Sequence, residues 1–175
     1  MKWFLAFLVL LFNLVTPTIP PTPTPVPEVI KPGFYKVIKV VDGDTINVEI
    51  NGKSQSVRLI GINSPELKDP RKQVECFALE ASNKAKEVLT GKNIRLESDP
   101  TQGDKDKYKR LLRYIFLENG TNFNKMMVEE GFAFEYTYAT PYKYQLEFKQ
   151  AQKTAEENKK GLWADTTCPI SPKIE

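Results

Sequence analysis

The chain has 175 residues, of which 41% are hydrophobic and 27% charged, as expected for one globular domain with some non-globular sequence added. The formal net charge of +3 is mild, and it permits an anionic ligand without arguing for one. Histidine is absent, which excludes His-based zinc sites, His general bases and Ser-His-Asp triads. Acid–base chemistry must therefore use carboxylates, Lys, Tyr or metal-bound water.

The first segment, residues 1–15, places one cation, Lys2, before the apolar run Trp3–Phe12. This pattern matches the apolar region of an export signal better than a full membrane span, which needs ~20 residues. No A-x-A cleavage site and no lipobox cysteine follow, so the segment is predicted to be a signal peptide or a short membrane anchor. A buried core helix is the alternative, but no amphipathic pattern supports it. We expect an extracytoplasmic protein, secreted or anchored at the outer face of a membrane.

Residues 16–33 are predicted to form a Pro/Thr-rich linker. Six of the twelve residues from 16 to 27 are proline, so neither a helix nor a sheet can continue there. An extended polyproline-II spacer is expected. A proline-rich binding motif is the alternative, although a position directly after an export signal favours a stalk.

From Phe34 onward, the sequence predicts short strands and helices. The expected strands are 34–41, 45–50, 54–62, 93–97 and 111–117. The turn signal Asn51-Gly52 joins the second and third of these strands in a hairpin. The expected helices are 77–89, a short one capped by Asn122, and a last one opened by Thr140-Pro141.

This order of elements predicts an α+β, mainly β fold. It would be a five-stranded OB-fold Greek-key barrel with three helices, inserted after the third strand and following the fifth. The domain is expected to cover residues 34–166, and residues 167–175 are expected to form a C-terminal tail.

Four polar features lie within or beside the expected strands. They are Asp42-Gly43-Asp44-Thr45, Arg58, Asn63-Ser64-Pro65-Glu66 and Asp106-Lys107-Tyr108-Lys109-Arg110. Each alone has an ordinary interpretation, because Asp-Gly-Asp commonly marks a turn and exposed charges are commonly solvated. In combination and in this order, they resemble the staphylococcal nuclease (thermonuclease) family.

The resemblance extends over residues 34–164, including Glu80-Ala81-Ser82, 128–133 and Gly161-Leu162-Trp163. It implies an OB barrel and a calcium-dependent endonuclease that hydrolyses phosphodiester bonds of DNA and RNA with little sequence specificity and leaves 3′-phosphate ends. Single-stranded or frayed nucleic acid is the implied partner. A monomer is expected, with a possible membrane tether through residues 1–15.

The resemblance also implies individual roles. The calcium ligands would be Asp44, Asn63 and the backbone carbonyl of Ser64. Glu66 would be the general base, and Arg58 and Arg110 would grip the phosphate. The nucleotide-binding residues would be Lys107, Tyr108, Tyr136 and Tyr138. The chemistry is consistent, because calcium prefers hard oxygen ligands and a guanidinium fork matches phosphate oxygens.

Two residues depart from the family pattern. Asn63 stands where the family usually has Asp, which removes one negative charge and predicts weaker calcium binding. Asp44 would then be the main anionic ligand, with help from Asp42 or Glu66. Lys109 stands in place of Gly beside Arg110, where it either strengthens substrate binding or, as we favour, projects into solvent.

The two cysteines, Cys76 and Cys168, are too few for a structural zinc site. In an oxidising compartment they could close one long loop and fix the tail to the barrel. The alternative is two unrelated thiols.

Two other functions compete with the nuclease. One is a catalytically inactive OB-fold module that binds single-stranded nucleic acid, and the other is an interaction protein displayed on the proline stalk. Glu66, Arg58 and Arg110 are all present, which favours the nuclease, whereas Asn63 alone favours the inactive module.

Overall fold

The computed structural model describes residues 32–67 and 73–168. The predicted signal or anchor, most of the predicted linker and the end of the predicted tail lie outside the described residues. Among the residues that are described, no helix has the length and apolar character needed to cross a membrane.

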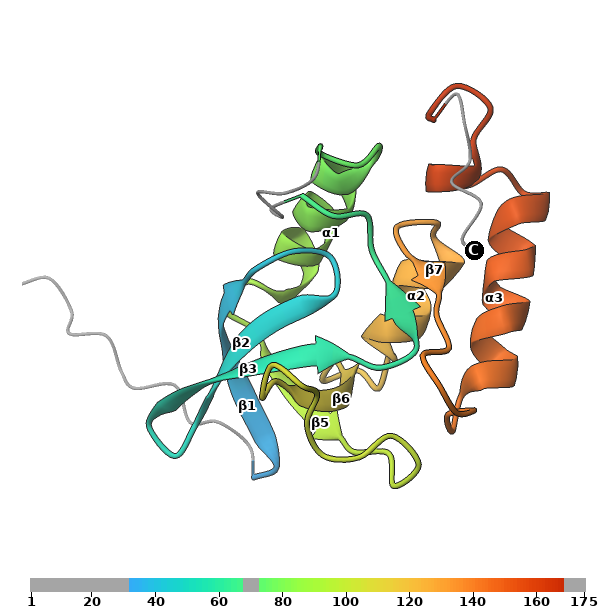
Figure 1. The fold of residues 1–175 in the computed structure, drawn as a ribbon. Helices are drawn as coiled ribbons and strands as arrows, with labels where there is room; N and C mark the ends of the chain where they lie inside the picture. Colours follow the sequence, from blue (N-terminus) through green and yellow to red (C-terminus); the bar gives the residue numbers. More distant parts are fainter. Residues whose placement is uncertain (1–31, 68–72, 169–175) are drawn as a thin grey trace, which may run out of the picture.

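A closed barrel forms the centre of the molecule (Figure 1). Its strands are β1 (Phe34–Val40), β2 (Thr45–Ile50), β3 (Lys53–Leu59), β5 (Asn93–Glu97) and β6 (Leu111–Phe116). They pair in the order β1-β2-β3-β6-β5, and β5 pairs with β1 to close the barrel. Every pairing is antiparallel except β3 with β6, which is parallel. The predicted α+β OB-fold barrel of five strands is confirmed.

Three helices surround the barrel, as predicted: α1 (Ala78–Leu89), α2 (Phe123–Glu129) and α3 (Gln145–Glu157). Asn122 caps α2 as expected, because its side-chain oxygen accepts a hydrogen bond from Lys125 N at 3.1 Å. Figure 1 shows α2 between the barrel and α3. A short 3-10 helix, η1 (Gly161–Trp163), follows α3.

One hydrophobic core joins the barrel to the helices. Its fully buried members from the barrel include Val37, Val48, Val57, Ile94 and Ile115. Leu89 of α1, Met127 of α2 and Phe148 of α3 belong to the same core. Burying these apolar side chains fixes the barrel and the helices as one body, and the site residues stand on its rim.

The predicted third strand is too long, because β3 ends at Leu59. Gly61 breaks the strand with φ +79, in a conformation that favours glycine. A side chain there would also collide with Tyr142, whose ring lies 2.6 Å from the position of an added Cβ. The chain turns at Gly61 and continues as β4 (Ile62–Asn63), which pairs with β7 (Phe134–Glu135). The sequence analysis missed both of these short strands.

The predicted start of the last helix is also wrong. Thr140-Pro141 does not open α3, which begins at Gln145. The backbone carbonyls of Thr140 and Pro141 instead accept hydrogen bonds from Gln102 Nε2, at 3.1 and 3.3 Å. Tertiary contacts therefore hold this segment outside the helix, which begins four residues after Pro141.

Candidate active site

The turn between β1 and β2 places Asp44 at the rim of the barrel. Val41 N donates to Thr45 O at 2.9 Å to close the turn. Gly43 permits the turn to approach the segment after β4, because an added Cβ would lie 2.6 Å from Ser64 Cβ. Ser64 N then donates to Asp44 Oδ2 at 2.8 Å. Two stretches that are 20 residues apart in sequence therefore meet here.

Arg58 connects this turn to β4. Strand pairing sets it opposite Thr45 in the barrel. Its Nη2 lies 3.0 Å from Asp44 Oδ2 and donates to Asn63 Oδ1 at 3.2 Å. Its Nη1 donates to the carbonyls of Leu59 and Ile62, both at 2.9 Å. Asp44 and Asn63, two of the predicted ligands, thus share one guanidinium.

Arg110 joins the same cluster from the loop before β6. Its Nη1 donates to Thr45 Oγ1 at 3.4 Å, and Thr45 Oγ1 donates to Asp44 Oδ1 at 3.0 Å. Arg110 Nε forms an ion pair with Asp106 Oδ2 at 2.7 Å. The structure therefore brings together the predicted site residues Asp44, Arg58, Asn63, Ser64 and Arg110.

Asp106 shapes the loop that carries Arg110. Its Oδ1 accepts hydrogen bonds from Tyr108 N and Arg110 N, both at 2.9 Å. Burial acts to raise the pKa of Asp106, but these hydrogen bonds and the charge of Arg110 hold that pKa below its ordinary value. Lys109 lies between these donors with φ +64, and it is exposed to solvent. The departure from Gly thus places a cation in solvent beside Arg110.

The predicted nucleotide-binding residues lie in two places. Tyr108 is exposed. The guanidinium carbon of Arg110 lies 5.3 Å from the centroid of its ring, and Lys107 Nζ lies 5.1 Å from it. Tyr136 follows β7, where its N–H donates to Gly61 O at 3.0 Å. The rings of Tyr136 and Tyr138 lie 6.4 Å apart. No contact among the described residues joins these two tyrosines to Tyr108.

Glu66 lies after Pro65, in a stretch that forms neither helix nor strand. Its N–H donates to Glu75 Oε2 at 2.9 Å, and its carbonyl accepts from Glu75 N at 3.0 Å. Glu66 is partly buried and stands two residues beyond Ser64. The backbone of Glu66 is therefore tied to Glu75 and, through Ser64, to Asp44.

Asp42 and Asp44 place two carboxylates close together. Asp42 Oδ1 accepts from Asp44 N at 3.1 Å. Burial, and then the charge of Asp44, raise the pKa of Asp42 to about 7. Burial is the larger cause, so a second carboxylate charge beside Asp44 is costly here, and a bound cation would lower that cost.

The oxygen atoms of the cluster are of the kind that could hold a hard divalent cation. Within residues 32–67 and 73–168, no three acidic or cysteine side chains gather as a metal cage. Calcium also accepts amide and backbone carbonyl oxygens, however, and it is less demanding in geometry than magnesium. Asp44 with Asn63 and Ser64 supplies such a mixed set of hard oxygens, beside the second carboxylate of Asp42.

Thr45 and Asp106 have roles that the sequence analysis did not assign. Thr45 links Arg110 to Asp44 through its hydroxyl, and Asp106 orients Arg110. A carboxylate four residues before an arginine in a loop is a signal that could have pointed to Asp106. Nothing in the sequence points to the hydroxyl bridge, because it joins residues 65 positions apart.

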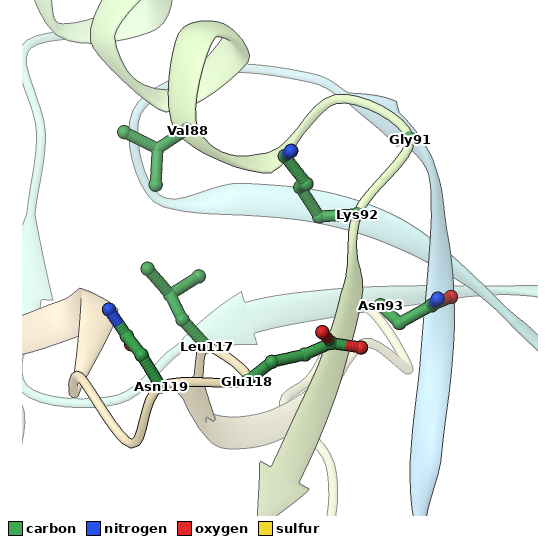
Figure 2. A pocket seen from close by; sticks show the side chains of 7 residues that line it. All are labelled: Val88, Gly91, Lys92, Asn93, Leu117, Glu118 and Asn119. Atoms are coloured by element: carbon green, nitrogen blue, oxygen red, sulfur yellow. The ribbon is translucent and has the colours of Figure 1, made fainter. Parts of the chain in front are cut away.

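A cavity of about 400 Å³ lies elsewhere, at the carboxyl end of α1. Figure 2 shows Val88 from α1 and Leu117 from the segment after β6 bordering the same space. Lys92, Glu118 and Asn119 form polar parts of its wall. No predicted site residue lines this cavity, so the candidate active site is the open cluster at the barrel rim.

The fold and the site together define an OB barrel with two arginines and an oxygen-rich cluster at one rim, which suits a phosphate ligand with a metal ion. A model of the family "Staphylococcal nuclease homologue" matches residues 56–165. The chain belongs to this family.

Several curated proteins are similar to the chain. The thermonuclease of Staphylococcus hyicus is 43% identical over 131 residues, which cover 75% of this chain and 76% of that protein. The thermonuclease of Staphylococcus intermedius is 39% identical, over 74% of this chain and 75% of that protein. Endonuclease YncB of Bacillus subtilis is 34% identical, over 72% of this chain and 59% of that protein.

Proposed function

We propose that this nuclease is a calcium-dependent endonuclease that cleaves DNA and RNA with little sequence specificity and leaves 3′-phosphate ends. Hydrolysis of phosphodiester bonds follows from the family and from relatives named thermonuclease and endonuclease. The observation that carries the finer proposal is the convergence of two arginines on Asp44. Arg58 contacts it directly at 3.0 Å, and Arg110 reaches it through Thr45.

The two arginines would hold the phosphate and stabilise its charge in the transition state. A guanidinium presents paired N–H donors that match two phosphate oxygens, and removal of one such donor typically costs about 100-fold to 1,000-fold in rate. Arg58 approaches from β3 and Arg110 from the loop before β6, so they can contact different oxygens of one phosphate.

Glu66 would act as the general base. It would accept a proton from the water that attacks phosphorus, since the chain has no histidine for this role. Asp44, Asn63 and Ser64 would hold the calcium ion, with Asp42 beside them. A bound calcium ion polarises a phosphate oxygen and helps to orient a water molecule.

Exposed tyrosines favour unpaired bases as the substrate. Tyr108 is 66% exposed, with Lys107 and Arg110 beside its ring, and Tyr138 is 77% exposed. Stacking of a base on an aromatic ring is largely independent of sequence. Tyr108 and Lys107, with Tyr136 and Tyr138, would therefore bind single-stranded or frayed DNA and RNA with little sequence preference.

The setting of the enzyme is proposed from the sequence alone. Residues 1–15 would export the chain or tether it at the outer face of a membrane, and the linker would hold the barrel away from that surface. We expect it to act as a monomer.

A cleavage assay tests the proposal. The full chain is incubated with single-stranded DNA and RNA in calcium, in magnesium, and in calcium with excess chelator. Cleavage in calcium that stops on chelation and returns when calcium is restored is expected. The products should block extension by a polymerase until a phosphatase removes the 3′-phosphate. Cleavage that continues in chelator, or 3′ ends that extend at once, would contradict the proposal.

A further inference from the structure

The disulfide is the one motif of the sequence that the proposed function leaves without a role. The structure joins Cys76 and Cys168, whose Cα atoms lie 6.0 Å apart although 92 residues separate them in sequence. Cys76 is exposed to solvent, and its Sγ lies 3.2 Å from Thr167 O. We define residues 161–168 as the C-terminal segment. The disulfide fixes this segment to Cys76, which lies just before Phe77 and α1.

Cys76 directly follows Glu75, which is the hydrogen-bond partner of Glu66. Glu75 accepts a hydrogen bond from Glu66 N at 2.9 Å through its side chain and donates one to Glu66 O at 3.0 Å through its backbone. These two bonds hold the backbone of Glu66 from the carboxyl-terminal side. The disulfide thus lies one residue away from Glu75, which forms hydrogen bonds with Glu66.

The same C-terminal segment is also linked, through Phe134, to the other end of the stretch from Asn63 to Glu66. Asn63 pairs in β4 with Phe134 of β7. The ring of Phe134 meets Trp163 edge to face, with centroids 5.4 Å apart. The C-terminal segment is therefore linked to both ends of this stretch, through Phe134 to Asn63 and through residues 75–76 to Glu66.

The C-terminal segment is itself fixed to the body of the molecule. Leu162 is buried, and its N–H donates to Gly131 O at 2.9 Å at the end of α2. A fixed segment that is linked through single intervening elements to both ends of a catalytic stretch can set the position of that stretch.

We propose that the C-terminal segment and its disulfide position Glu66 for catalysis, with Glu75 as the positioning residue between them. The inference rests on the proposed role of Glu66 as general base. Glu66 belongs to no helix or strand, so its placement depends on such contacts. A general base must lie within hydrogen-bond reach of its proton, and a misplacement of about 1 Å can cost about 100-fold in rate.

A double-mutant cycle in kcat tests the connection. Glu75→Ala in the oxidised full chain should lower kcat about tenfold and leave KM within about twofold, because it displaces the base rather than the phosphate grip. In a chain that carries Cys76→Ser and Cys168→Ser, the same change should lower kcat by less than about twofold. Glu75→Gln keeps an acceptor oxygen and should restore most of kcat. Glu87→Ala, at an exposed position on α1, is the matched control and should leave kcat unchanged.

Amide hydrogen exchange at Glu66 gives a readout that does not depend on activity. A dithiol reductant breaks the S–S bond, converts both sulfurs to thiols and is itself oxidised to a disulfide. Exchange at Glu66 N–H should rise at least about tenfold on reduction and also in Glu75→Ala, while core amides stay protected.

Additive effects in the cycle would overturn the proposal, as would unchanged Glu66 exchange in a chain shown to carry two free thiols. Loss of all cleavage in the oxidised, unmodified chain would instead be a failure of the proposed function. The exchange measurement would then still decide whether the disulfide positions Glu66. If the serine variants do not fold, Glu75→Ala and reduction of the unmodified chain make the same test.

Discussion

The two arginines of the site are held in different ways. Arg58 lies within the barrel, where four partners from the turn before β2, from β3 and from β4 surround a guanidinium whose side chain is 15% exposed. Arg110 stands at the end of a loop, is 28% exposed, and takes its orientation from Asp106 in that loop. Arg58 is thus part of the frame as well as the site, whereas Arg110 belongs mainly to the site.

The largest expected effect is that of replacing each arginine with lysine. It distinguishes the structural role of Arg58 from the role proposed for both arginines in catalysis. Arg58→Lys and Arg110→Lys should each lower kcat about 100-fold to 1,000-fold, because an ammonium lacks the paired donors of the fork. Only Arg58→Lys should also lower the free energy of unfolding substantially, by about 2 kcal/mol, because Asp44, Asn63 and two carbonyls lose hydrogen bonds.

Cleavage assays and urea unfolding of both variants measure this difference. Arg110→Lys should stay within about 0.5 kcal/mol of the unmodified chain, as is usual for surface substitutions. Equal losses of stability in the two variants would show that Arg110 is also part of the frame.

A second variant addresses the loop that carries Arg110. Asp99 is 2% exposed and accepts hydrogen bonds from Tyr114 Oη at 2.7 Å, Lys143 N at 2.8 Å and Thr101 N at 2.9 Å. These bonds join the base of the loop to the segment before α3. Asp99→Asn should lower the free energy of unfolding at pH 7 by about 1–3 kcal/mol, because the ionised acceptor is lost.

The pH dependence of this effect has a definite sign. Burial acts to raise the pKa of Asp99, but its hydrogen bonds outweigh burial and hold that pKa below the ordinary value of 3.8. The stabilisation is therefore present above pH ~4 and is lost as the pH falls through the lowered pKa. Urea unfolding at several pH values should show the difference between Asp99→Asn and the unmodified chain shrinking in acid. A difference that grows in acid would contradict this account.

A smaller effect is expected when Arg110 loses the carboxylate of Asp106 that orients it. Asp106→Asn removes the charge that pairs with Arg110 Nε but keeps the shape of the side chain. It should lower kcat about tenfold, less than the loss of the arginine itself, because Arg110 stays present in a less defined orientation. Glu49→Gln, at an exposed position on β2, is the matched control. A change in kcat equal to that of the control would show that Asp106 does not orient Arg110 for catalysis.

The smallest effect concerns the departure at Asn63. Asn63→Asp should strengthen calcium binding about threefold to tenfold in calorimetry, because a carboxylate replaces a neutral amide oxygen. The new carboxylate would also face Arg58, which already donates to Asn63 Oδ1 at 3.2 Å. Equal or weaker calcium binding would show that residue 63 is not a ligand.

The sequence predicted the parts of the fold that local signals define. The Asn51-Gly52 turn sets the pairing of β2 with β3, and Asn122 caps α2. Tertiary contacts decided the rest. The alternation of apolar and polar residues continues past Leu59 and predicts a longer strand. The strand ends earlier because the chain turns at Gly61, against the ring of Tyr142. The two-residue strands β4 and β7 exist only because they pair with each other.

The same division applies to the site. Motifs predicted Asp44, Arg58, Asn63 and Arg110, and the structure gathers these side chains within hydrogen-bond distance of one another or of Thr45. The bridge through Thr45 and the link from Glu66 to Glu75 depend on distances between elements, which composition and spacing do not encode. The backbone of Glu66 is held by hydrogen bonds to Glu75 rather than by a strand or helix.

The most direct measurement of the central claim compares Glu66→Gln with the unmodified chain on single-stranded DNA in calcium. Glutamine keeps the size of the side chain but accepts no proton. We predict that the rate of cleavage falls at least about 100-fold, while the variant still retards DNA and unfolds at the same temperature. A folded Glu66→Gln chain that cleaves at the unmodified rate would contradict the account, and an unmodified chain that retards DNA without ever cleaving it would make the barrel a binding module.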